Sequence, residues 1–172
     1  MTINFNQNYF QLFEIKKNFN VDTNILEKNY FELQKKFHPD KYVNATDHEK
    51  RLSLQITSYI NEAYETLKDD YLKSIYLLKI EGYEFDDQNN TLSDPDFLMN
   101  QMELREESEN IALKKDKEDI KRFYLKLNNL KKECLKEFEK NYCNNFFDEF
   151  EKKIKEMKFF ISIENDFKKS DL

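Results

Sequence analysis

Glycine and proline are nearly absent from this chain, which has one Gly and two Pro in 172 residues. Tight hairpins, close strand turns and glycine-rich phosphate loops are built from these residues, so a strand-rich fold and a nucleotide-binding loop are both disfavoured. Charged residues instead make up 36% of the chain and recur at spacings that suit amphipathic helices. The composition therefore predicts an all-α fold.

The chain also lacks an excess of positive charge and any long apolar run. Its net charge of -6 and pI near 5.2 disfavour a nucleic-acid partner, because binding phosphates requires a basic patch. No stretch reaches the ~18 consecutive apolar residues of a membrane span, and the N-terminal residues show no export signal. We expect a cytoplasmic protein without a membrane partner.

Cysteine is scarce as well. Cys134 and Cys143 lie nine residues apart with no CxxC pair anywhere, so a zinc site or redox motif has no support. We expect both to be buried thiols in a reducing compartment. Two cysteines also cannot supply the four thiolates that an iron-sulfur cluster usually needs. We expect no cofactor.

Apolar residues at steps of three and four predict two antiparallel helices in the first part of the chain. Their inward positions are Leu26, Tyr30, Leu33 and Phe37, then Leu52, Ile56, Ile60, Ala63 and Leu67. Asp22 and Thr23 can cap the first helix, and Pro39 requires it to end near Phe37. The second starts near Asp47.

Shorter helices flank this pair. One is expected around Tyr9 to Phe13, and another from Tyr71 to about Glu81, where Gly82 suits a left-handed C-cap. The inward residues expected on the latter helix are Leu72, Ile75, Tyr76 and Leu78. Residues 1–82 therefore form a first domain.

The acidic stretch 83–93 has no periodicity and is interpreted as a linker. Residues 94–172 are expected to form a second domain, an antiparallel three-helix bundle. Ser93 and Asp94 precede Pro95 as a helix start. The expected helices run from Pro95 to about Asn110, from about Asp116 to Glu139 and from about Asn145 to Phe167, with a turn at Asn141 to Asn145. The inward residues expected on the last two are Ile120, Phe123, Leu127, Leu130, Cys134, Phe138, Phe147, Phe150, Ile154, Met157 and Ile161.

The tripeptide His38-Pro39-Asp40 lies between the two long helices of the first domain. Proline holds an imidazole and a carboxylate rigidly on one loop, which suits docking on a polar surface at little ordering cost. A plainer alternative is a turn in which Asp40 caps the next segment and His38 is merely solvated.

The stretches NYFQLFEI, QKKFHPDKY and INEAYETLKDDYLKSIYLL resemble the J-domain family. The resemblance implies that His38, Pro39, Asp40 and Tyr30 bind a DnaK-type chaperone and accelerate its ATPase, while this chain is no enzyme. The helix before the loop is basic in that family, and the matching cations here are Lys28, Lys35, Lys36 and Lys41. An ordinary solvated charged face is the alternative for the lysines. Phe31 and Glu32 stand where many members carry a basic pair.

Five residues after the linker mix apolar and acidic groups on one helix face. They are Leu98, Met99, Met102, Glu103 and Glu106. Flexible Met anchors with a charged rim are typical of a partner surface, although a bundle helix with Met filling gaps is the alternative. The segment FLMNQMELREE resembles the motif of HscB-type J-domain co-chaperones, so these residues, with Phe159, are implied to bind the scaffold IscU. The family's further acidic position is Asn110 here.

That resemblance implies a monomeric co-chaperone that hands IscU to an HscA-type chaperone and assists iron-sulfur cluster transfer. Two other functions stay open: a J-domain protein whose bundle binds a different client or dimerises, and a coiled-coil adaptor in which the tripeptide is accidental. Metal binding by His38, Asp40 and His48 is disfavoured because the loop already has a role.

Overall fold

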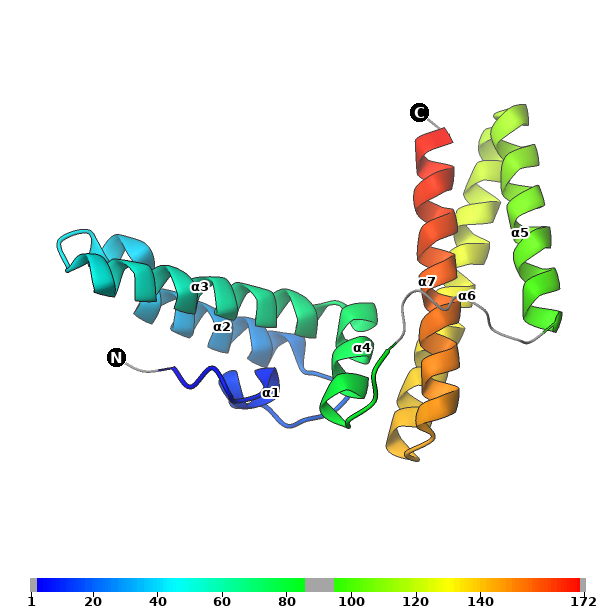
Figure 1. The fold of residues 1–172 in the computed structure, drawn as a ribbon. Helices are drawn as coiled ribbons and strands as arrows, with labels where there is room; N and C mark the ends of the chain where they lie inside the picture. Colours follow the sequence, from blue (N-terminus) through cyan, green and yellow to red (C-terminus); the bar gives the residue numbers. More distant parts are fainter. Residues whose placement is uncertain (1–2, 86–94, 171–172) are drawn as a thin grey trace. The chain divides into compact units, whose positions relative to one another are not determined.

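The computed structural model describes residues 3–85 and 95–170, and Figure 1 traces their path. The described ranges contain helices joined by turns and short irregular segments, with no strand, which confirms the all-α prediction. The chain divides into two compact units, Met1–Glu81 and Gly82–Leu172. Residues 86–93 of the expected linker, and the expected caps Ser93 and Asp94, lie outside the described residues.

The first unit is a pair of long helices with shorter helices beside it. Its elements are α1 (Tyr9–Leu12), α2 (Thr23–Phe37), the 3₁₀ helix η1 (Pro39–Tyr42), α3 (Asp47–Lys68) and α4 (Asp70–Ile80). Figure 1 shows α2 and α3 side by side, with η1 in the connection between them. The Asp22 carboxylate caps α2, and Thr46 and Glu49 form a capping box at the start of α3. These local signals fix where the hairpin begins and turns.

The α2–α3 interface buries six of the nine residues that the periodicity predicted, and Tyr30, Leu33 and Leu52 are half-buried. Leu26, Phe37, Ile56, Ile60, Ala63 and Leu67 are buried. The prediction for Leu72 on α4 was wrong, because Lys73, Ser74, Leu77 and Leu78 occupy the inward arc and leave Leu72 exposed. Gly82 adopts φ +88° just after α4, as a left-handed C-cap requires.

Tyr9 ties the N-terminal helix to the rest of the first unit. Its ring stacks on Tyr76 of α4 with centroids 4.2 Å apart, and its backbone N–H donates to the Tyr76 hydroxyl at 2.9 Å. Its own hydroxyl donates to Glu62 of α3 at 2.9 Å. One side chain therefore links α1, α3 and α4.

The second unit is an antiparallel bundle of α5 (Pro95–Lys114), α6 (Lys117–Cys143) and α7 (Phe147–Ser170). Two ends differ from expectation: α5 continues past Asn110, and α6 continues through Cys143, inside the expected turn. Lys115 and Asn145 adopt φ of 52° and 58°. Each reverses the chain in a single left-handed residue, so both connections are shorter than the sequence suggested.

The bundle core follows the expected stripe through most of its length. Phe123, Leu127, Cys134, Phe138, Phe150, Ile154 and Met157 are buried. Near the end of α7 the buried positions are Phe160, Ile163 and Phe167, whereas Ile161 is only half-buried. Cys143 is exposed, contrary to expectation, because it is the last residue of α6. Among the described residues, no helix has the length and apolar character needed to cross a membrane.

Candidate functional site

The loop His38-Pro39-Asp40 projects from the end of the α2–α3 hairpin. His38 is the C-cap of α2 in an extended conformation, and Pro39 opens η1. Exposed fractions are 51% for the His38 side chain and 87% for Asp40. The His38 Nδ1 atom accepts the Asp40 backbone N–H at 3.3 Å and lies 3.5 Å from Asp40 Oδ2. The loop thus presents an imidazole and a carboxylate to solvent.

Two hydroxyl groups of α3 hold the residue before this loop. Ser53 Oγ donates to the carbonyl oxygen of Phe37 at 2.9 Å, and Thr57 Oγ1 donates to the same oxygen at 3.2 Å. The last carbonyls of a helix lack intrahelical partners, so the two bonds satisfy a group that would otherwise be costly to bury. The Tyr42 hydroxyl also donates to the Lys36 carbonyl at 3.4 Å. The loop's position is therefore fixed from α3 and η1.

The four lysines singled out in the sequence all have exposed side chains. They are Lys28, Lys35, Lys36 and Lys41. In the part of the chain that the structure describes, none forms an ion pair within 4.0 Å. Three lie on α2 and the fourth on η1, so positive charge gathers beside the exposed loop. Uncompensated surface charge of this kind steers an acidic partner.

Tyr30 is half-buried against α3, and its role in chaperone binding stays a prediction. Its ring stacks on Tyr64 of α3 with centroids 4.0 Å apart, and its hydroxyl donates to Asn61 Oδ1 at 3.1 Å. Gln34 also hydrogen-bonds Asn61. Tyr30 thus sets the α2–α3 packing next to the lysines, while the neighbouring Phe31 is exposed.

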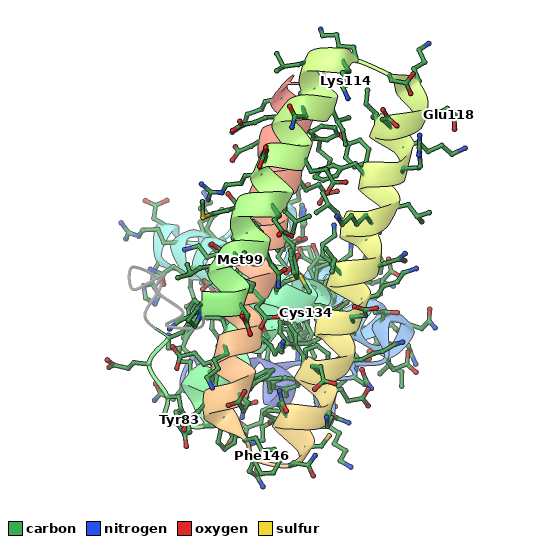
Figure 2. The ribbon with its side chains drawn as sticks, turned by 90° about the vertical axis from the view of Figure 1, so that its right-hand side faces the viewer. Tyr83, Met99, Lys114, Glu118, Cys134 and Phe146 are labelled. Atoms are coloured by element: carbon green, nitrogen blue, oxygen red, sulfur yellow. The ribbon has the colours of Figure 1, made fainter. Side chains whose placement is uncertain are left out.

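The apolar and acidic residues of α5 face solvent. Leu98, Met99 and Met102 are 42%, 62% and 73% exposed, and Glu103 and Glu106 are exposed beside them. The helix rests on the bundle through Leu104 and Ser108 instead, which are buried. Figure 2 views this unit with Met99 and Lys114 labelled along α5. The outward methionines are therefore not fillers of the bundle core.

Phe159 does not share that exposed face. The sequence placed it with the α5 residues, but only 8% of it is exposed. Its ring meets Phe97 edge-on at 6.1 Å, and the Arg105 guanidinium lies over it at 5.6 Å from the centroid. Phe159 of α7 therefore packs against α5 through Phe97 and Arg105. Arg105 was not among the residues predicted from the sequence.

The sequence analysis also missed Ser53, Thr57 and Leu113. The two hydroxyl residues lie four apart, a spacing that places both on one side of α3, but no local pattern marks their acceptor. Leu113 is 83% exposed near the end of α5. Its eleven-residue spacing from Met102 is the sequence signal that could have placed it on the outward side of α5.

The buried Cys134 thiol has a raised pKa. Burial raises the pKa of the Cys134 thiol to about 12, with nearby Glu156 adding to the effect, and Sγ donates to the Lys153 carbonyl at 3.1 Å. Such a thiol stays protonated and is a poor nucleophile. Across the described residues, no three His, Cys, Asp or Glu side chains are grouped to hold a metal ion.

Known proteins resemble the chain along nearly its whole length. A family profile described as the HSCB C-terminal oligomerisation domain matches residues 93–168. A co-chaperone protein HscB homolog from Vibrio parahaemolyticus is 34% identical over 160 residues, covering 92% of this chain and 94% of that protein. Another, from Shewanella halifaxensis, is 46% identical over 104 residues, a match that spans 60% of each protein. The solved structure of chaperone HscB from Vibrio cholerae has a TM-score of 0.87 and 33% identity, covering 94% of this chain and 96% of that one.

Proposed function

This chain belongs to the HscB family of J-domain co-chaperones, and we propose that it delivers an IscU-type iron-sulfur scaffold to a DnaK/HscA-type chaperone and stimulates that chaperone's ATPase. The observation that carries the proposal is the separation of two exposed surfaces. One is the loop of His38, Pro39 and Asp40 on the first unit, and the other is the outward face of α5 on the second.

The first unit provides the chaperone contact. The exposed loop docks on the chaperone, and Lys28, Lys35, Lys36 and Lys41 steer the encounter. Because the loop is anchored through Phe37 to α3, little conformational entropy is lost on docking. ATP is hydrolysed by the chaperone. Docking accelerates that reaction only by binding the hydrolysis-competent conformation better than the others.

The second unit provides the scaffold contact. Leu98, Met99 and Met102 bury apolar area against the scaffold, and Glu103 and Glu106 form a charged rim. Within the described residues neither glutamate has an ion-pair partner on this chain, which leaves both available to cations of the scaffold. The cluster is cargo of the scaffold and stays on it.

The finer properties of the protein follow from the same proposal. The chain acts in the cytoplasm and contributes no catalytic group, metal ion or cofactor of its own. It works as a monomer. Measuring the mass of the protein in solution tests whether it is a monomer. The test matters because the family profile that matches residues 93–168 is described as an oligomerisation domain.

Titration calorimetry with an IscU-type scaffold, then with the chaperone, tests the proposal. We expect one scaffold per chain and a three-component complex once the chaperone is added. A J-domain protein with another client would hold unfolded polypeptide and ignore the scaffold. A helical adaptor would bind no chaperone. Either result would contradict the proposal.

A further inference from the structure

A groove runs between α5 and α7 on the second unit, and of the residues already assigned to the scaffold only Phe159 lines it. Its volume is about 620 Å³, and its floor includes Phe159, Ile163 and Phe167, all nearly inaccessible to solvent. Ala112 and Ser162 are small and stand on opposite helices along its length. Their size leaves an apolar depression where larger side chains would have filled the space between the helices.

Leu113 forms one edge of this groove and is 83% exposed, more than any other large apolar side chain in the described residues. A single exposed leucine needs no explanation. Leu113, however, follows Met102 by eleven residues, which is close to three full helical turns, so both project on the same side of α5. The side of α5 that carries Leu98 and Met102 therefore reaches Leu113 after roughly 22 Å. Arg105, Glu106 and Glu109 occupy this side between Met102 and Leu113.

Arg105 and Glu109 connect the groove to that face. Both line the groove, and both are exposed on α5 between Met102 and Leu113. Arg105 lies over the Phe159 ring at the end nearer Met102. In the described part of the chain, Glu109 has no ion-pair partner. The groove thus combines an apolar floor with the carboxylates of Glu109 and Asp166 and the guanidinium of Arg105.

We propose that the groove between α5 and α7 is a second contact for the same scaffold, receiving an apolar side chain that a basic residue accompanies. This inference rests on the proposed function, because the occupant is the partner assigned to the neighbouring face. Leu113 is its outer anchor, Phe159, Ile163 and Phe167 form its floor, and Glu109 pairs with the cation. The scaffold footprint on α5 then extends three turns past Met102.

Calorimetric titration of the intact chain with an IscU-type scaffold tests this with two pairs of variants. Leu113→Gln removes the anchor, and its control is Leu125→Gln, an exposed leucine on α6. Ser162→Lys places a long side chain at the groove, and its control is Asn128→Lys, an exposed position on α6. All four sites are exposed, so the melting temperature should stay within a few degrees of the parent's. Met102→Gln tests the contribution of the outward face of α5 to scaffold binding independently of the groove.

We expect Leu113→Gln and Ser162→Lys each to weaken scaffold binding about tenfold, as loss of an interface anchor does, and the two controls to change it less than about twofold. If Met102→Gln weakens binding while both groove variants match their controls, the groove proposal is wrong and the proposed function stands. If the parent chain binds no scaffold, both fail. If Leu113→Gln alters only self-association in sedimentation, the groove contacts a second copy, and the proposal is overturned.

Discussion

The hydroxyl of Ser53 donates a 2.9 Å hydrogen bond to the carbonyl oxygen of Phe37, the last residue of α2, and neither side chain is accessible to solvent beyond 2%. Phe37 directly precedes the loop proposed to bind the chaperone. A buried hydrogen bond between α2 and α3 therefore fixes the position of the residue from which this exposed loop extends. Thr57 donates to the same oxygen.

Replacing both hydroxyls, as Ser53→Ala with Thr57→Val, should destabilise the protein by about 1–3 kcal/mol, because the Phe37 carbonyl loses its side-chain partners. Stimulation of the chaperone should also fall severalfold under conditions where the variant is still folded, since the loop is less firmly held. Urea unfolding and ATPase rates measure the two effects. Ser58→Ala, an exposed serine of α3, is the control. A double variant as stable and as active as this control would remove the anchoring argument.

Binding to the chaperone should weaken as salt rises, more steeply than binding to the scaffold does, because screened lysines steer the first and apolar anchors dominate the second. Lys35→Glu should reduce chaperone affinity by up to about fivefold, given roughly 0.2–1 kcal/mol for an exposed charge pair. Lys132→Glu on α6 is the matched control. The affinities for the chaperone and for the scaffold should be measured at a series of salt concentrations. If salt weakens both to the same extent, the lysines do not steer chaperone binding.

Replacing Leu98, Met99 and Met102 together by Ala should abolish most scaffold binding and leave folding intact. These side chains are exposed, so the triple variant avoids the roughly 2–5 kcal/mol that truncating a buried Leu or Met costs. Scaffold affinity should fall by several powers of ten, since central anchors are worth about 2 kcal/mol or more each. Chaperone stimulation without scaffold should persist.

Leu104→Ala provides the contrast on the same helix, because Leu104 is 7% exposed and packs into the bundle. Thermal melts and scaffold titrations on both variants separate binding from stability. A collapsed melting temperature in the triple variant would show that its three side chains belong to the core after all. Undiminished scaffold affinity would show that this face of α5 is not the contact.

The two cysteines should differ sharply in reactivity. Burial raises the pKa of Cys134 to about 12, so at pH 8 very little of it is thiolate, whereas Cys143 is exposed at the end of α6. Mass spectrometry after brief maleimide treatment should find one label on the native protein and two after unfolding. The Cys143→Ser variant should take up none while folded. Rapid double labelling of the native parent would contradict the packing of Cys134.

Local signals in the sequence determine much of this fold. Asp22 caps α2, Pro39 ends it and Gly82 closes α4, and each acts through its own backbone or side chain. The misplaced ends were those at Lys115 and Asn145, where non-glycine residues adopt left-handed φ. Asn is known to do so at helix ends, whereas Lys115 gives no local signal of its conformation in the sequence.

Part of the candidate site could likewise be predicted from the sequence. His38, Asp40 and the outward residues of α5 could be found because their types and spacing are unusual. The burial of Phe159 could not be predicted from the sequence, because whether an aromatic residue at helical spacing lies on a surface or beneath Arg105 depends on which helix covers it. Its role in scaffold binding stays a prediction. The support of the loop by Ser53 and Thr57 likewise depends on contacts between distant residues.

The most direct test of the whole account is the rate of ATP hydrolysis by the DnaK/HscA-type chaperone at saturating co-chaperone. The parent chain should raise the rate several-fold, and His38→Gln should abolish that rise while helix content and scaffold affinity remain unchanged. His48→Gln, which alters the other histidine at an exposed position in the first turn of α3, should stimulate like the parent. Full stimulation by His38→Gln, or none by the parent chain, would contradict the claim that this loop drives the chaperone.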